Sequence, residues 1–295
     1  MSLMGFLFGT GSKNKHKPAQ RAKGPGHKSR RLEFETLEPK YSPTGLGADF
    51  AAFANFGVLG LDGSKISITN PSTLIGGDVG IGKKGVENFS DGKISGWLYA
   101  DYTTNVSKSN NVVDMTGQKV HVAVLDMTAP VQGVLDASSQ IAAMAPTNPF
   151  NGAITTSRTF TATAPNHVNV IDVTGIQLDG SAKLTLNGGP NDYFFINDTG
   201  NFAMTGTSQL VLTGGVTQTH VVTNIVGSGQ QVAFTGSAFG QGTYIAVNRD
   251  IAVSGATVYG VIAGAQNHQI AITSGAHVQV NAPHFDASGL PPGIL

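Results

Sequence analysis

The sequence predicts a mainly β chain that coils as a solenoid of parallel strands. Its 39 glycines, 40% apolar residues and 12% charged residues suit stacked strands whose turns need positive φ angles. A phrase also recurs in which a glycine precedes a short β-branched run. The glycines that open it are Gly180, Gly206, Gly236, Gly255 and Gly275, which are 26, 30, 19 and 20 residues apart. We therefore expect one turn of the coil per phrase.

Short β-branched runs bounded by glycine predict the individual strands. The expected strands are 66–70, 76–82, 93–100, 120–125, 168–173, 183–186, 193–196, 209–212, 220–226, 231–234, 243–247, 250–254 and 269–273. A sandwich or barrel with tight hairpins would also satisfy this spacing. The glycine-led phrases recur after every two or three strands. Asn-Gly and Asp-Gly dipeptides, which are typical of tight hairpin turns, are few. Both observations favour the solenoid.

One helix is expected among the strands, at residues 128–146. Val134, Ala137, Ile141 and Met144 recur there at helical spacing and form one apolar face. Such a helix must pack on a broad surface, and the side of the strand stack is that surface. Residues 48–63 are apolar and small, and we expect a helical turn there that leads into a strand.

Charge is distributed unevenly along the chain. Residues 1–40 contain nine Lys/Arg and three Glu, and the remaining 255 residues contain nine Lys/Arg and fifteen Asp/Glu. We expect a disordered basic tail over residues 1–47, a β-helix domain over 48–285 and a C-terminal tail over 286–295. The basic stretch 13–31 contains no aromatic residue, so we expect no nucleic-acid binding. No apolar window is long enough for a transmembrane helix.

The segment RRLEFETLEPK (30–40) resembles the LEPR-type sorting signature near the N-termini of some bacterial surface proteins. Leu37, Glu38 and Pro39 match the signature, and Lys40 stands where the signature has arginine. The resemblance implies export. An ordinary linker is the alternative interpretation of the same residues.

The run HVNVIDVTGIQLDGSAKLTLNGGPNDYFFINDTGNFAMTG (167–206) resembles the choice-of-anchor A adhesive domain. QGTYIAVNRDIAVSGATVYGVIAG (241–264) is similar to a second part of that domain. Residues 54–82 look like the start that this family shares with ice-binding-like proteins. The resemblance extends from Ala48 to Val280. It implies a right-handed parallel β-helix with one α-helix packed along its side, in an exported, surface-associated protein, and it supplies no catalytic residues.

Catalytic and metal-binding motifs are not found in the sequence, so we expect no enzyme, no cofactor and no metal site. The rival enzymatic prediction is a polysaccharide lyase or hydrolase, which needs clustered carboxylates beside a base or a second acid. The candidate acids are Asp172, Asp179, Asp192 and Asp198, and the candidate cations are Lys183 and Arg249. Asp192 and Asp198 are expected to serve turns instead.

Threonine is the residue type that could form a binding surface on a flat solenoid face. The candidate ligand-binding residues are Thr155, Thr159, Thr161, Thr163, Thr213, Thr217 and Thr219. These threonines do not recur in register at the solenoid period, which counts against an ice-binding array. We therefore expect an exported bacterial adhesive or structural module, extracellular or at the cell surface, that binds a glycan or matrix ligand without turnover. Ice binding on the same fold is the alternative.

Overall fold

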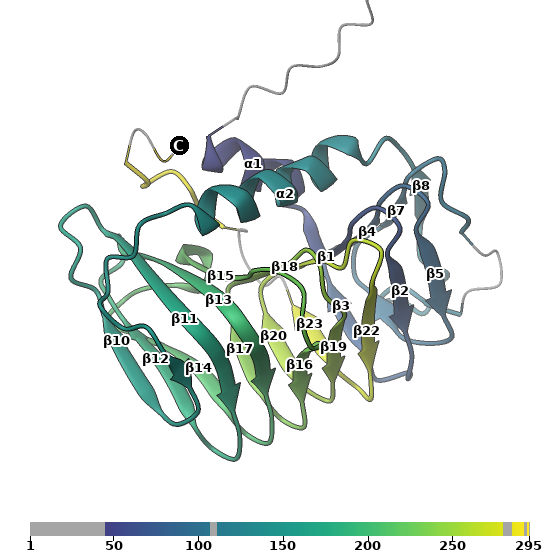
Figure 1. Ribbon diagram of the computed structural model, residues 1–295. Helices are drawn as coiled ribbons and strands as arrows, with labels where there is room; N and C mark the ends of the chain where they lie inside the picture. Colours follow the sequence, from purple (N-terminus) through teal and green to yellow (C-terminus); the bar gives the residue numbers. More distant parts are fainter. Residues whose placement is uncertain (1–44, 107–110, 280–284, 292–293, 295) are drawn as a thin grey trace, which may run out of the picture. The chain divides into compact units, whose positions relative to one another are not determined.

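The computed structural model describes residues 45–106, 111–279, 285–291 and 294, and it is a solenoid of parallel strands (Figure 1). The predicted basic tail and the sorting residues Leu37, Glu38, Pro39 and Lys40 lie outside the described residues. All pairs of named strands are parallel, which confirms the solenoid over the sandwich or barrel.

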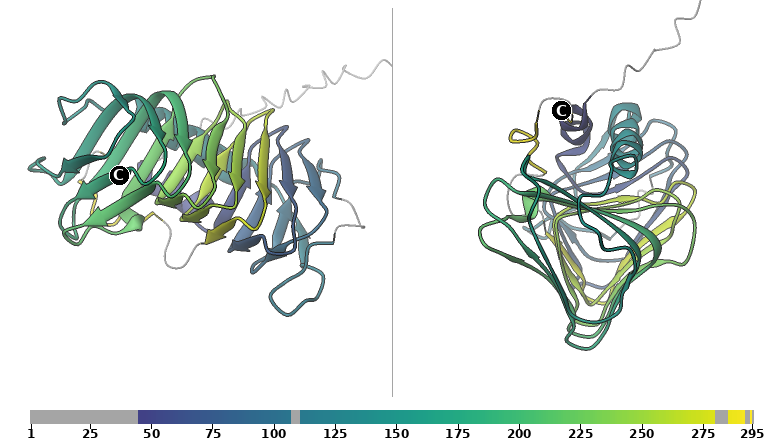
Figure 2. Two further views of the ribbon diagram at one scale, coloured as in Figure 1. Left: turned by 90° about the horizontal axis from the view of Figure 1, so that it is seen from below. Right: turned by 60° about the vertical axis from the view of Figure 1, so that its left-hand side comes forward.

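Each turn of the coil contributes strands to three faces, so that the turns are triangular when viewed along the coil (Figure 2, right). Face A consists of β1 (Phe56–Gly60), β4 (Asp78–Ile81), β7 (Leu98–Ala100), β8 (Val122–Val124), β15 (Val221–Ile225), β18 (Thr243–Ala246), β21 (Ile262–Gly264) and the first parts of β11 (Val168–Leu178) and β13 (Tyr193–Met204). Face B consists of β2 (Lys65–Ile68), β5 (Val86–Phe89), β9 (Ala153–Ile154), β16 (Val232–Thr235), β19 (Ile251–Ser254), β22 (Gln269–Thr273) and the second parts of β11 and β13. Face C consists of β3 (Leu74–Gly76), β6 (Lys93–Ile94), β10 (Arg158–Thr161), β12 (Lys183–Asn187), β14 (Gln209–Thr213), β17 (Phe239–Gln241), β20 (Thr257–Tyr259) and β23 (His277–Gln279).

The interior of the coil is filled by columns of apolar side chains, because alternate residues of each strand point inward. One column of face B is Ile176, Phe202, Val232, Ile251, Ile270 and Ile66, and all of them are buried. The next is Leu178, Met204, Phe234, Val253, Ile272 and Ile68. No single turn could bury these side chains, so the turns are stable only as a stack.

The recurring glycines form one corner of the coil, where face B passes into face C. Gly180, Gly206, Gly236, Gly255 and Gly275 have φ angles of 55°, 66°, 73°, 67° and 72°. Consecutive corners are joined by hydrogen bonds, such as Thr207 N–H to the Gly180 carbonyl at 2.6 Å and Ser237 N–H to the Gly206 carbonyl at 2.7 Å. The prediction of one turn per phrase is therefore confirmed.

The order of the turns in space differs from their order in the sequence. The last turn pairs with the first: β21 with β1, β22 with β2 and β23 with β3. In Figure 1 the yellow strand β22 accordingly lies beside the blue strand β2. The two turns that follow the first extend the stack beyond it, and the chain then crosses through α2 (Thr128–Ala142) to β9 and coils back.

Face A is covered by helices (Figure 1). Val134, Ala137 and Ile141 of α2 are fully buried against this face, which confirms the predicted helical stripe. α1 (Leu46–Phe53) precedes β1, which confirms the helical turn expected before a strand in residues 48–63, and it packs beside α2 as a second helix. Gly133 permits this close approach, because a Cβ atom there would lie 2.6 Å from the Asp49 carbonyl oxygen.

The C-terminal residues beyond 285 were expected to form a tail, and the described ones pack on the domain instead. Phe285, the last residue of the predicted domain, stacks on Phe50 of α1 with ring centroids 4.1 Å apart. Leu290 is buried in the same apolar cluster. The Leu46 N–H donates to the Ile294 carbonyl at 3.2 Å. The folded domain therefore includes residues that the sequence alone assigned to a tail.

Two buried ionisable side chains, Arg249 and Asp198, lie at the corner between faces A and B. Arg249 is 1% exposed and donates to the carbonyls of Gly227 at 3.1 Å, Gly200 at 2.5 Å and Val226 at 2.9 Å. Asp198 is fully buried, and its Oδ2 has no hydrogen-bond partner among the described residues. Burial raises the pKa of the Asp198 carboxyl to about 6, although the Gly200 N–H and the Arg249 charge oppose this shift.

Replacement of Gly206 by alanine is expected to cost more stability than replacement of Gly180. Both positions have positive φ, which costs a residue with a Cβ atom roughly 1–2 kcal/mol. A Cβ on Gly206 would also lie 2.9 Å from the Gly180 carbonyl oxygen, whereas a Cβ on Gly180 meets nothing within 4 Å. Urea denaturation of Gly206→Ala and Gly180→Ala measures the difference, and equal losses would contradict the stacking of these corners.

The Asp198→Asn variant is expected to lose a pH dependence that the unmodified protein shows between pH 4 and 7. Between the ordinary carboxyl pKa of 3.8 and about 6, the folded protein holds more protons than the unfolded chain, so its stability falls as pH rises. The effect is on the order of 3 kcal/mol in the free energy of unfolding. Denaturation at pH 4 and 7 measures it, with Asp179→Asn as the control at an exposed carboxyl. Parallel pH profiles for the unmodified protein and Asp198→Asn would contradict this prediction.

Candidate binding face

The outer surface of face B carries two columns of small side chains in register. The first consists of Ala203, Ala233, Ala252 and Ala271, which lie directly beside one another on β13, β16, β19 and β22. Ser67 continues this column on β2. Adjacent strands are about 4.8 Å apart, so the methyl groups repeat at that distance along the coil.

The second column carries hydroxyl groups and lies two residues further along each strand. Its members are Thr205, Thr235, Ser254, Thr273, Thr69 and Ser90. Each of them stands at the corner with face C, and in the first three turns of this column the corner glycine follows directly. Face B therefore presents paired methyl and hydroxyl groups that repeat from one turn to the next.

Larger polar side chains border these columns on the side towards face A. They are Asn201, Gln231, Asp250, Gln269 and Lys65. At one end Ser67 is only 4% exposed, because the amides of Asn88 and Gln269 each donate to its hydroxyl at 3.2 Å. The accessible alanine column thus ends at Ala271.

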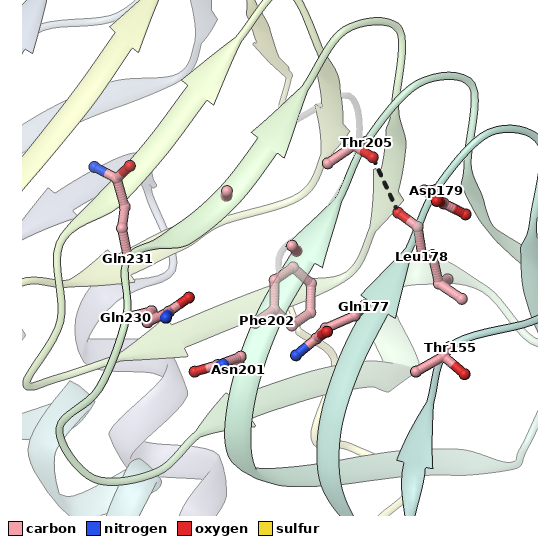
Figure 3. Close-up of a pocket in the computed structure, with 11 residues that line it drawn as sticks. Thr155, Gln177, Leu178, Asp179, Asn201, Phe202, Thr205, Gln230 and Gln231 are labelled. Carbon is pink, nitrogen blue, oxygen red and sulfur yellow. Dashed lines mark hydrogen bonds between the residues drawn. The ribbon is translucent and has the colours of Figure 1, made fainter.

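At the other end of face B the surface is hollowed. The hollow has a volume of about 650 Å³, and its lining includes Gln177, Asn201, Gln230, Gln231 and Asp179 (Figure 3). It lies where the turns are longest. Paired positions are 27 residues apart between Phe195 and Val222, and 18 residues apart between Ile245 and Ala263.

The other two faces lack a comparable array. The helices cover face A. On face C the outward column Phe239, Thr257, His277 and Leu74 mixes aromatic, hydroxyl, imidazole and aliphatic groups. Face B is therefore the surface of the described coil whose outward groups repeat.

The structure distributes the seven predicted threonines over several places. Thr155 lines the hollow of face B. Thr159 lies on face C, and Thr161 shares a column there with Thr213, separated from it by Asn187. Thr163 lies in the loop after β10, where its N–H donates to Asn169 at 3.0 Å.

Thr217 directly precedes the short 3₁₀ helix η1 (Gln218–His220), and Thr219 lies within it; their hydroxyls are 2.7 Å apart. The structure thus brings Thr159, Thr161 and Thr213 onto one face and leaves the other four apart. Their assignment as ligand-binding residues remains a prediction.

None of the seven threonines belongs to the hydroxyl column of face B, whose members do recur in register. The signal for the columns is present in the sequence as AMT (203–205), AFT (233–235), AVS (252–254) and AIT (271–273). Each turn contributes only one alanine and one hydroxyl residue to the columns, so they do not form a cluster of threonines in the sequence.

The carboxylates considered for glycan cleavage serve other contacts. Asp192 accepts from the Gly189 N–H at 2.7 Å, which confirms its expected place in a turn, and also contacts His167 at 2.8 Å. Asp198 and Arg249 are buried at a corner. Asp179 lines the hollow and lies at the corner between faces B and C, whereas Asp198 lies at the corner between faces A and B.

Among the described residues there is no group of three or more His, Asp or Glu side chains that could hold a metal ion. No helix in the described ranges is both long and apolar enough to cross a membrane.

Solved structures resemble this coil at low sequence identity. An ice-binding protein from an Antarctic bacterium of the Flavobacteriaceae is 20% identical with a TM-score of 0.56, and the match covers 79% of this chain and 47% of that one. The chain thus spans about half the length of that protein. An ice-binding protein from an Arctic yeast is 17% identical with a TM-score of 0.52, covering 81% and 98% of the two chains.

A third, from the Antarctic ascomycete Antarctomyces psychrotrophicus, is 22% identical with a TM-score of 0.50 and coverages of 81% and 100%. At these identities the likeness shows the fold alone. A comparison with curated proteins finds no match.

The family model of the ice-binding-like adhesive domain matches residues 46–275. This range begins with α1 and ends at the corner glycine of the last turn, so it contains all of face B. Since the match includes well over half of the 295 residues, the chain belongs to the ice-binding-like adhesive domain family.

Proposed function

We propose that this chain is a non-catalytic adhesive module that acts outside the cell or at the cell surface, and that it attaches to an ordered surface through face B. The observation that carries the proposal is the pair of registered columns, alanine and serine or threonine, on neighbouring strands from β13 to β22. The family description and the resemblance of residues 30–40 to a sorting signature support the extracellular location.

Ice is the ligand that this array fits best. Ice presents water molecules at a fixed repeat, and a protein surface can hold water in the same order only where its own groups repeat rigidly. Hydrogen bonding between the strands fixes the repeat along the coil, and the alternation of side chains fixes the distance between the two columns. Methyl groups with neighbouring hydroxyls offer both apolar contact and hydrogen bonds to such water. The similar solved structures are of ice-binding proteins, which agrees with this choice.

A glycan or matrix ligand is the second candidate. The observation that favours it is the polar hollow at one end of face B, which interrupts the flat array. An ordered solid gains nothing from a hollow, whereas a soluble polymer can enter one.

Substitution of tyrosine for Ala271 is expected to abolish binding to ice. Ala271 lies between Ala252 and Ser67 in the alanine column, and a phenol ring there would hold the surface away from a flat ligand. Thr185→Tyr is the matched control, because Thr185 lies in the middle of β12 on face C. Ice-affinity partitioning and recrystallisation inhibition measure the effect. Equal losses in both variants would place the contact elsewhere, and an inactive unmodified protein would remove ice as the ligand.

A further inference from the structure

We propose that the hollow at the wide end of face B is a binding site for a segment of a neutral oligosaccharide. It rests on the glycan candidate of the proposed function. The site adjoins the proposed ice contact, because Ala203, Ala233 and Thr205 of the regular columns also line the hollow, while its amides lie beside the columns. The inference follows from the chemistry of the lining, its charge and its rigidity.

Side-chain amides dominate the polar lining of the hollow. Gln177, Asn201, Gln230 and Gln231 come from three successive turns, and Figure 3 shows Gln177, Asn201 and Gln230 spread across one part of it. Among the described residues, none of these four amides makes a side-chain hydrogen bond. Each amide offers two donors and an acceptor, which matches the paired donor and acceptor character of a sugar hydroxyl.

The charge of the lining selects against an anionic ligand. Asp179 is the one ionisable residue among the lining residues, and no Lys or Arg accompanies it. A carboxylate or phosphate on the ligand would meet a like charge with no cation to offset it. A neutral sugar meets no such penalty, and Asp179 can accept hydrogen bonds from its hydroxyls.

The base and wall of the hollow are held in place before any ligand arrives. Ala203 and Ala233 contribute methyl groups from paired strands, against which the C–H groups of a sugar ring can pack. The segment that leads to Gln230 and Gln231 is anchored by Arg249, which donates to the Val226 and Gly227 carbonyls at 2.9 Å and 3.1 Å. A preformed site loses less conformational entropy on binding. The volume of about 650 Å³ accommodates sugar rings rather than a single water or ion.

Titration with defined hexasaccharides tests the proposal. Cellohexaose, maltohexaose and xylohexaose are the neutral probes, hexagalacturonate is the anionic probe, and the side-chain amide signals in a ¹⁵N-correlated NMR spectrum are the readout. At least one neutral hexasaccharide is expected to shift the signals of Gln177, Asn201, Gln230 and Gln231 saturably. The double variant Gln177→Ala, Gln231→Ala is expected to weaken this binding about tenfold or more, since two hydrogen-bonding amides are removed.

Gln209→Ala on face C is the matched control and is expected to leave the affinity unchanged. The proposal is overturned if none of the neutral probes binds, if the shifts lie outside the hollow, if only hexagalacturonate binds, or if the double variant binds as well as the unmodified protein. Ala271→Tyr separates the two contacts, because that residue is two turns beyond Ala233. Loss of ice binding in Ala271→Tyr with intact sugar binding would show that they are independent.

Discussion

The register of the stacked turns is the constraint on which the rest of the structure depends. Hydrogen bonds between parallel strands place each residue beside its counterpart in the next turn, so every inward position becomes an apolar column and every outward position a surface column. The corner glycines maintain this register, since their positive φ angles let successive backbones turn at the same place within contact distance. A shift of one residue in any turn would place its apolar set on the surface.

The three faces of the coil have different roles because they differ in what their outward residues contact. The central strands of face A are buried beneath α1 and α2, while Val122 and Val124 of its edge strand β8 are exposed. Polar groups add to this packing: Asn224 donates to the Ser138 carbonyl at 2.9 Å and Asn197 to the Ile141 carbonyl at 3.0 Å. With face A covered and face C irregular, the repeated groups of face B remain available for a ligand.

The crossing made by α2 lets the first turns of the coil stack against the last one. Because the last turn stacks on the first, strands from both ends of the chain join one sheet, and Ala271 lies beside Ser67 although the two are far apart in sequence. The wide turns at the other end bring a hollow lined with amides. Face B thus combines a flat, repeating region with a concave polar region, and the two suit different kinds of ligand.

The sequence by itself determined the solenoid, most of its strands and the existence and start of α2, because glycine spacing, β-branched runs and a helical apolar stripe are local signals. The predicted end of this helix, residue 146, was too late, since α2 ends at Ala142. It did not separate the three-residue strands β17, β20 and β23, which are too short to show a period. The sequence also contains the Ala-x-Thr and Ala-x-Ser segments of face B. Their alignment in neighbouring turns cannot be inferred from it, because hydrogen bonds between turns set the register. Only the tertiary structure decided that the last turn meets the first, that residues beyond 285 pack on α1, and that four separated amides line one hollow. Those relations depend on long-range stacking and on the return path through α2, for which no short stretch of sequence contains the information.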